Sequence, residues 1–135
     1  VESMSENLAQ EVAPFGIRVS IVEPGVTRTA ILAKNMGHPE PTEYETPYRR
    51  MLQFYARGVM ANTPAEEVAT VIHGALEDPN PKLRYPCAWG GEELCSGRTK
   101  LDDAAWVALG ACESDDEYYA AFEKCFGLDI RPASE

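Results

Sequence analysis

Residues 17–29 constrain the fold more than any other part of the sequence. The run Ile-Arg-Val-Ser-Ile-Val-Glu is rich in β-branched side chains and leads directly into Pro24-Gly25, which ends it. Such near-continuous apolar content is typical of a strand buried on both faces of a parallel sheet. Residues 17–23 are therefore predicted to form a strand of this kind.

A helix is predicted on the N-terminal side of this strand. Met4, Leu8 and Val12 follow one another at four-residue intervals, which places them on one face of a helix over residues 1–14. Pro14 and Gly16 close it, because glycine is the usual residue just past a helix end.

A second helix and strand complete a βα…β crossover, which is right-handed in nearly all known cases. Thr63 is expected to cap the helix, with Pro64 at its first position and Glu66 completing a capping box. The run Asp78-Pro79-Asn80-Pro81 stops the helix. Residues 83–88 then favour a short strand that ends at the two glycines of positions 90 and 91.

Residues 27–62 are less regular and form a candidate substrate lid. A short helix at 30–34 and a loop at 37–41 precede a helical pattern over 44–60 that is rich in Met, Tyr and Phe. Ordinary packing against the sheet explains such an apolar stripe equally well. The candidate substrate contacts are Tyr44, Tyr48, Met51 and Phe54.

The last quarter of the chain, residues 100–135, is predicted to be a helical acidic tail. One helix is expected over 101–109, and another is capped by Ser114 with Glu117 and ended by Gly127. The whole chain carries a net charge of −10, of which −7 lies in residues 102–135. Nucleic-acid binding is not expected because it requires a basic face.

The remaining composition points to a reducing, aqueous setting. No run approaches the roughly 18 apolar residues of a membrane helix, so no membrane partner is expected. The four cysteines lack C-x-x-C spacing and neither histidine has a second ligand close in sequence, so no metal site is predicted. The cysteines are therefore interpreted as reduced thiols of a cytoplasmic protein.

Three segments in order resemble the C-terminal half of the short-chain dehydrogenase/reductase family. Pro24-Gly25-Val26-Thr27-Arg28-Thr29 matches the family motif P-G-x-hydrophobic-x-T at the end of the sixth strand. Residues 1–19 are similar to the helix that carries the family's Y-x-x-x-K at its front, and residues 63–85 resemble its last helix and strand. The resemblance implies an α/β fold with a Rossmann-like, doubly wound parallel sheet. About two strands plus helices, all within one domain, would lie in residues 1–135.

The resemblance also implies a role for each residue of the motif. Pro24 and Gly25 would let the backbone turn close under the nicotinamide ring of NAD or NADP. Backbone groups of Val26 and Thr27 would bond the carboxamide, although Thr27 stands where the family usually has Val or Ile. The hydroxyl of Thr29 would bind the carboxamide or the pyrophosphate.

The catalytic residues of the family are expected upstream of this chain. Its tyrosine, lysine, serine and glycine-rich loop would all precede Val1, and no tyrosine here is followed by a lysine four positions later. The chain starts with Val rather than Met, which suggests a fragment that is incomplete and inactive alone. Its parent is expected to transfer hydride between the nicotinamide and a small secondary alcohol or ketone, as a homo-oligomer paired through the first helix.

Two other hypotheses remain at this stage. A non-catalytic binding or interaction protein derived from the same fold would need to cover the edge of the 17–23 strand. An acidic helical module without a cofactor fits the tail but leaves residues 24–29 unexplained. Within the enzyme hypothesis, Pro24-Gly25 could also be no more than a turn that ends a strand.

Overall fold

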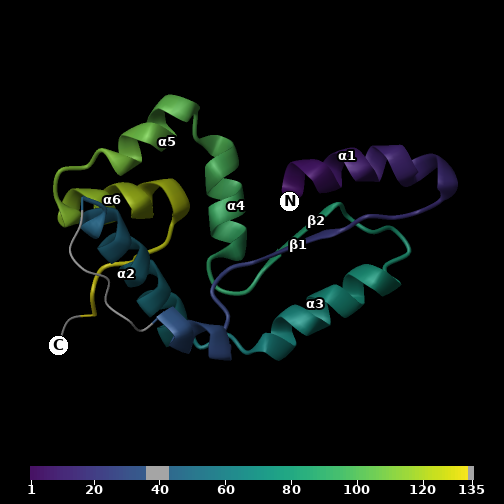
Figure 1. Ribbon diagram of the computed structural model, residues 1–135, viewed down its shortest axis with the longest axis horizontal. Coiled ribbons are helices and arrows are strands. Elements are labelled where there is room, and N and C mark those ends of the chain that lie inside the picture. The colour runs from purple at the N-terminus through teal and green to yellow at the C-terminus, as the bar shows by residue number, and fades with distance from the viewer. Residues whose placement is uncertain (36–42, 134–135) are drawn as a thin grey trace.

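The computed structural model describes residues 1–35 and 43–133, which form six α-helices, two strands and two 3₁₀ turns within these ranges (Figure 1). In chain order the elements are α1 (Glu2–Val12), η1 (Ala13–Phe15), β1 (Ile21–Pro24), η2 (Ala30–Asn35), α2 (Glu45–Ala61), α3 (Ala65–Glu77), β2 (Arg84–Cys87), α4 (Gly91–Lys100), α5 (Asp103–Gly110) and α6 (Asp115–Phe126). The predicted loop at 37–41 lies outside the described residues.

The two strands lie side by side and run parallel, with Ile21 opposite Arg84 and Pro24 opposite Cys87. The helix α3 packs on both strands and α4 packs on β2, and Figure 1 shows them on opposite sides of the sheet. The prediction of a partial α/β, Rossmann-like fold is therefore confirmed. We call α1, β1, α3 and β2 the sheet region, and α2, α4, α5 and α6 with residues 127–130 the helical region.

The first strand is shorter and more exposed than predicted. It begins at Ile21 rather than at residue 17, and Ile17 is 56% exposed, so the prediction of burial on both faces is wrong for this end. The reason is that the preceding residues bond the end of α3 instead of a strand. The guanidinium of Arg18 donates to the carbonyl oxygens of Asp78, at 2.7 Å, and Leu76, at 3.1 Å.

The start of α3 also differs from the sequence prediction. Pro64 is the N-cap residue, in an extended conformation, and no side-chain hydrogen bond caps this helix. The predicted capping box of Thr63 and Glu66 is therefore wrong. Thr63 is instead buried, and its carbonyl accepts a hydrogen bond from the backbone N–H of Arg28 at 2.8 Å.

The helix α4 was not predicted, because two glycines at positions 91 and 97 weaken its helical signal. Packing explains the second glycine. A Cβ atom on Gly97 would lie 2.4 Å from a ring carbon of Phe126 and 2.8 Å from the carbonyl oxygen of Cys125. Glycine thus allows α4 to approach α6 closely.

The end of the chain follows its local sequence signals. Ser114 and Glu117 form the predicted capping box of α6, and Gly127 ends the helix in the left-handed conformation. The preceding helix, predicted over 101–109, is α5 at Asp103–Gly110. It starts later because Asp102 is its cap and accepts a hydrogen bond from the backbone N–H of Ala105 at 2.7 Å.

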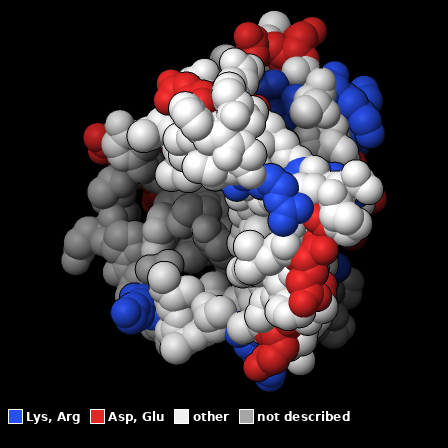
Figure 2. All heavy atoms as spheres, turned by 90° about the vertical axis from the view of Figure 1, so that its right-hand side faces the viewer, with Lys and Arg blue, Asp and Glu red and all other residues white. Residues whose placement is uncertain are grey.

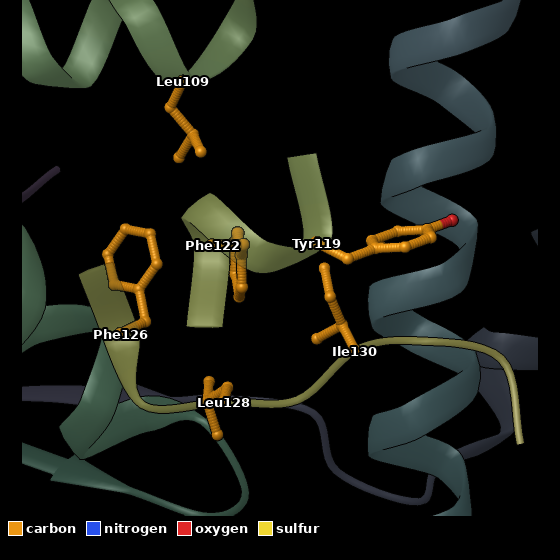
Figure 3. Packing of buried hydrophobic residues seen from close by; sticks show 6 residues of the cluster. All are labelled: Leu109, Tyr119, Phe122, Phe126, Leu128 and Ile130. Carbon is orange, nitrogen blue, oxygen red and sulfur yellow. The ribbon is translucent and has the colours of Figure 1, made fainter. Parts of the chain in front are cut away.

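The largest buried cluster lies in the helical region. It consists of six residues drawn from α5, α6 and the segment after α6: Leu109, Tyr119, Phe122, Phe126, Leu128 and Ile130. Figure 3 shows their side chains converging, with the ring of Tyr119 directed toward α2. Ile130 is fully buried. The acidic tail of the sequence analysis thus contains the main hydrophobic core.

The helix α1 is attached to the sheet by charge rather than by apolar burial. None of its residues is buried, and Met4 and Leu8 are exposed. Arg84 on β2 donates to Glu2 at 2.9 Å and to Glu6 at 2.8 Å, and it also pairs with Glu23 on β1. Hydrogen bonds to Glu6 and then Glu2 are the main reasons why the pKa of Arg84 is raised. Figure 2 shows the end of the molecule that carries the far ends of α1 and α3, where acidic and basic groups lie near one another among uncharged residues.

No helix among the described residues is both long and apolar enough to span a lipid bilayer.

Candidate functional site

The candidate site lies where β1 ends, at residues 24–29. In open parallel sheets, ligands bind at the carboxyl ends of the strands, and this segment continues from that end of β1. Gly25 is required there by packing. A Cβ atom on it would lie 2.0 Å from the carbonyl oxygen of Trp89 and 2.6 Å from the backbone nitrogen of Gly91. The chain after β2 therefore lies directly against the turn.

Val26 is held from two directions. Its backbone N–H donates to the carbonyl oxygen of Trp89 at 2.9 Å, and its side chain is buried. Above it lies Gly58 of α2, where a Cβ atom would fall 2.3 Å from the Cβ atom of Val26. Of the backbone groups of Val26 that were expected to bond a carboxamide, the N–H is thus engaged within the protein.

The two threonines of the segment supply its unused polar groups. The hydroxyl of Thr27 is buried and makes no hydrogen bond within the described part of the chain. Thr29 is exposed, and its carbonyl accepts from the backbone N–H of Leu32 at 3.2 Å. Between them, the N–H of Arg28 bonds Thr63, which fixes the course of the backbone.

The four predicted substrate contacts all lie on α2 or at its start, but they differ in environment. Tyr44 and Met51 are exposed and Tyr48 is half-buried. Phe54 packs into the core, with its ring centroid 5.2 Å from that of Trp89 and 6.0 Å from that of Phe122. For Phe54 the structure thus favours the packing alternative, while substrate contact by the other three stays a prediction.

Tyr44, Tyr48 and Met51 are separated from the candidate site by their distance along α2, whereas Phe54 is not. Gly58 contacts Val26, and Tyr44 lies fourteen residues earlier, which is about 21 Å at 1.5 Å per helical residue. Phe54 is only four residues, about 6 Å, from Gly58, and it packs against Trp89, whose carbonyl oxygen bonds Val26. The four residues therefore do not form one cluster around the 24–29 segment.

A cavity of 380 Å³ lies at the other end of α2, close to the candidate site. It is lined by residues of α2, by Trp89 and by the segment that follows α6, namely Arg57, Met60, Ala61, Trp89, Gly127, Leu128 and Asp129. Arg57 donates to the carbonyl oxygen of Asp129 at 3.2 Å across its wall. Sequence reasoning missed this cavity because its walls come from three separated segments and no local pattern links them.

Several reactive groups of the chain are placed away from the site or are unsuited to nucleophilic chemistry. His73 pairs with Glu77 at 3.2 Å on the exposed side of α3. All four cysteines are free, and burial raises the pKa of the Cys87 and Cys95 thiols, which keeps them protonated. Within residues 1–35 and 43–133 no group of three or more metal-binding side chains is present.

Comparison with known proteins shows relatives of this sequence. The chain is 31% identical over 108 residues to an uncharacterized oxidoreductase of Schizosaccharomyces pombe, covering 80% of this chain and 46% of that protein. It is 37% identical over 93 residues to human 17-beta-hydroxysteroid dehydrogenase type 1, covering 63% and 28%. It is 33% identical over 99 residues to the bovine short-chain dehydrogenase/reductase family 9C member 7, covering 63% and 32%.

The chain belongs to the short-chain dehydrogenase/reductase family. It spans less than half of the length of each of these relatives. No known domain-family profile matches it. By their printed names, these relatives are oxidoreductases or dehydrogenases.

The residues of the site fit the nicotinamide cofactors that short-chain dehydrogenase/reductases generally use. A nicotinamide carries an uncharged carboxamide, which needs hydrogen-bonding groups of both kinds. The unpartnered hydroxyl of Thr27 is a buried polar atom that lacks such a partner, and burying it without one costs free energy. A carboxamide beside residues 27–29 would supply the missing hydrogen bond.

Proposed function

We propose that this chain is the C-terminal part of an NAD(P)-dependent short-chain dehydrogenase/reductase. The parent enzyme transfers hydride between NAD or NADP and a secondary alcohol or ketone. Support comes from the relatives, one of which is named a hydroxysteroid dehydrogenase and another a retinol dehydrogenase. Because the chain spans less than half of those proteins, the catalytic tyrosine, lysine and serine are assigned to a segment outside it.

The observation that carries the proposal is the set of polar groups at the carboxyl end of β1. Thr27 contributes backbone groups and a buried, unpartnered hydroxyl, and Thr29 contributes an exposed hydroxyl. The bound nicotinamide supplies or accepts the hydride. The role of this chain is to hold the carboxamide through these groups and thereby decide which face of the ring meets the substrate. Pro24 and Gly25 bring the backbone to that position.

The proposed substrate is a small alcohol or carbonyl compound. Tyr44, Tyr48 and Met51 remain the proposed contacts, and Phe54 supports them by packing α2 against the core. The exposed stripe of Met4 and Leu8 on α1 is the proposed pairing surface of a homo-oligomeric parent. A cytoplasmic location stays a prediction, and the four free thiols are compatible with it.

Two measurements on the natural polypeptide test the proposal. The first is its intact mass, which we expect to be about twice that of this chain because a complete doubly wound sheet needs more βαβ units. The second is a titration with NADH and NADPH, followed by nicotinamide fluorescence. A polypeptide of 135 residues that binds neither cofactor would contradict the proposal and favour the non-catalytic binding protein.

A pair of threonine variants locates the cofactor contact. Thr29→Val keeps the shape of the side chain but removes its hydroxyl, and we expect the Kd for the cofactor to rise about fivefold, because a hydrogen bond contributes roughly 1 kcal/mol. Thr70→Val is the control, since its hydroxyl bonds only the carbonyl oxygen of Glu66 on α3, at 2.9 Å. An equal effect of both variants would argue against a contact at Thr29.

A further inference from the structure

Arg50 has an environment that no sequence pattern indicated. It is only 4% exposed, yet its guanidinium has partners in the connection between α5 and α6 and at the first residue of α6. Its Nε donates to Asp115 at 3.0 Å, and its Nη2 donates to the carbonyl oxygens of Cys112, at 2.9 Å, and Ser114, at 3.0 Å. The ring of Tyr118 lies beneath it, with the guanidinium carbon 4.6 Å from the ring centroid.

Three residues of α2 spaced by four positions contact different parts of the rest of the molecule. Residues at such spacing share one face of a helix. Arg50 bonds the α5–α6 connection, Phe54 packs against Trp89 and Phe122, and Gly58 lies against Val26. Along this face, α2 connects the helical region to the segment that follows β1 (Figure 1).

A displacement of α2 at Arg50 also displaces Gly58, because the helix between them is rigid. Arg50 and Gly58 are eight residues apart, which is about 12 Å along a helix whose backbone is hydrogen-bonded throughout. The contact at Gly58 is so close that no Cβ fits there, so a small shift of α2 must move Val26. The other neighbour of Val26, the carbonyl oxygen of Trp89, leaves it little room to adjust.

We propose that Arg50 is a positioning residue for the backbone of residues 26–29, acting through α2 and the contact between Gly58 and Val26. In this way the acidic helices α5 and α6, which contribute no residue to the candidate site, set its geometry. The contacts of Arg50, Phe54 and Gly58 support this role in placing the backbone. The effect of Arg50 on cofactor binding rests on the proposed function.

The neighbouring Arg49 provides a matched control within the same turn. It also bonds Asp115, through its Nε at 2.9 Å, but its side chain is half exposed and makes no bond to the carbonyl groups of the connection. Hydrogen bonds from Arg49 and then Arg50 lower the pKa of Asp115, so the carboxylate stays ionised for both. The two arginines share a charge and a partner and differ in burial and in the carbonyl contacts.

The test is hydrogen exchange on the natural polypeptide, comparing Arg50→Lys with Arg49→Lys. Lysine keeps the charge but cannot reproduce the planar fork that bonds Asp115 and two carbonyl oxygens together. We expect Arg50→Lys to speed exchange of the Val26 and Arg28 amides about tenfold. The amide of Ile21, which bonds Leu83 at 2.7 Å within the sheet region, should change less than twofold. Arg49→Lys should change none of the three by more than about twofold, as surface pairs contribute little.

Two further variants guard against a general loss of folding. Asp115→Asn keeps the shape of the side chain but weakens the pairing with Arg50, and we expect it to speed exchange at Val26 in the same direction. Leu109→Val lowers stability within the core without touching α2's contact face, and we expect the exchange ratio between Val26 and Ile21 to stay as in the wild type. Unchanged Val26 exchange in Arg50→Lys, or a parallel rise at Ile21, would overturn the inference.

Cofactor titration separates this inference from the proposed function. If both hold, the Kd for NADH or NADPH rises in Arg50→Lys together with Val26 exchange, and stays as in the wild type in Arg49→Lys and Leu109→Val. If the exchange pattern appears but the wild-type polypeptide binds neither cofactor, the positioning role stands and the proposed function fails. If Kd is unchanged while Val26 exchange rises in Arg50→Lys, Arg50 does not position the cofactor site.

Discussion

The helical region and the sheet region hold their side chains by different means. In the helical region, aromatic and aliphatic residues of α5, α6 and residues 128–130 form a closed cluster, and α2 packs against it through Phe54. In the sheet region the buried apolar residues are few, with Ile21 on β1 and Ala75 on α3 among them. Large apolar side chains of this region and of the segments that precede its strands are exposed instead: Met4, Leu8, Phe15, Ile17, Ile72, Leu76 and Leu83.

The same contrast appears in the two arginine clusters. Arg50 in the helical region is buried, and its partners are one carboxylate, two carbonyl oxygens and an aromatic ring. Arg84 in the sheet region is partly exposed and pairs with three carboxylates. Buried pairs are costly to break, whereas exposed pairs are weakened by salt. The described residues therefore concentrate their stability in the helical region.

The largest expected effect is on the aromatic cluster. Phe122→Ala removes a buried ring and should lower the free energy of unfolding by about 3–5 kcal/mol. The control is Leu76→Ala on α3, where the side chain is 71% exposed and the change should stay within about 0.5 kcal/mol. Urea unfolding followed by circular dichroism measures both. Similar losses in the two variants would show that the regions are equally well packed.

A pair of glycine variants tests how tightly α2 of the helical region packs against Val26, which follows β1 of the sheet region. Gly58→Ala places a methyl group 2.3 Å from the Cβ atom of Val26, and overpacking of this kind costs about 1–3 kcal/mol. Gly74→Ala on α3 meets no atom within 4 Å and should stabilise the chain by about 0.5–1 kcal/mol, because alanine favours helix. Thermal unfolding should therefore shift in opposite directions, and a loss in both would argue against the tight contact at Val26.

The smallest effect is expected on α1. Arg84→Gln removes the charge that binds Glu2 and Glu6, so the amides of α1 should exchange faster while those of α6 stay unchanged. Raising the salt concentration to about 0.5 M should have the same effect on the wild type, since exposed pairs are screened. Hydrogen exchange by mass spectrometry distinguishes the two helices. Salt-independent exchange in α1 would mean that apolar contacts hold it.

Local sequence signals predicted the elements but not their attachment. The capping box of Ser114 and Glu117, the glycine end of α6 and the parallel pairing of the two strands all agree with the structure. These features depend on neighbouring residues or on the βαβ pattern. The helix α4 was missed because Gly97, which lowers helix propensity, is there to let Phe126 approach. The need for glycine at position 97 comes from a residue 29 positions later, so the sequence around Gly97 does not reveal it.

For the candidate site, too, the sequence predicted the local turn but not the distant contacts that shape it. The turn at Pro24-Gly25 is visible in the sequence, but the reason for Gly25 is the backbone of Trp89, which no local pattern reveals. The lid hypothesis treated α2 as an apolar stripe, and the structure shows that its contact face begins with a buried Arg50. A buried charge cannot be told from a surface charge by spacing alone, because its partners lie about 65 residues away.

The pairing of β1 with β2 also has a kinetic consequence. The ion pair of Glu23 and Arg84, one on each strand, joins residues 61 positions apart. At a synthesis rate of 5–20 residues per second on the ribosome, the partner strand β2 is made roughly 3–12 s after β1. During that interval Ile21 and Val22 have no β2 backbone to bond, and an unpaired strand edge exposes N–H and C=O groups that can pair with other chains. We expect slower synthesis across α2 and α3 to lengthen this exposure.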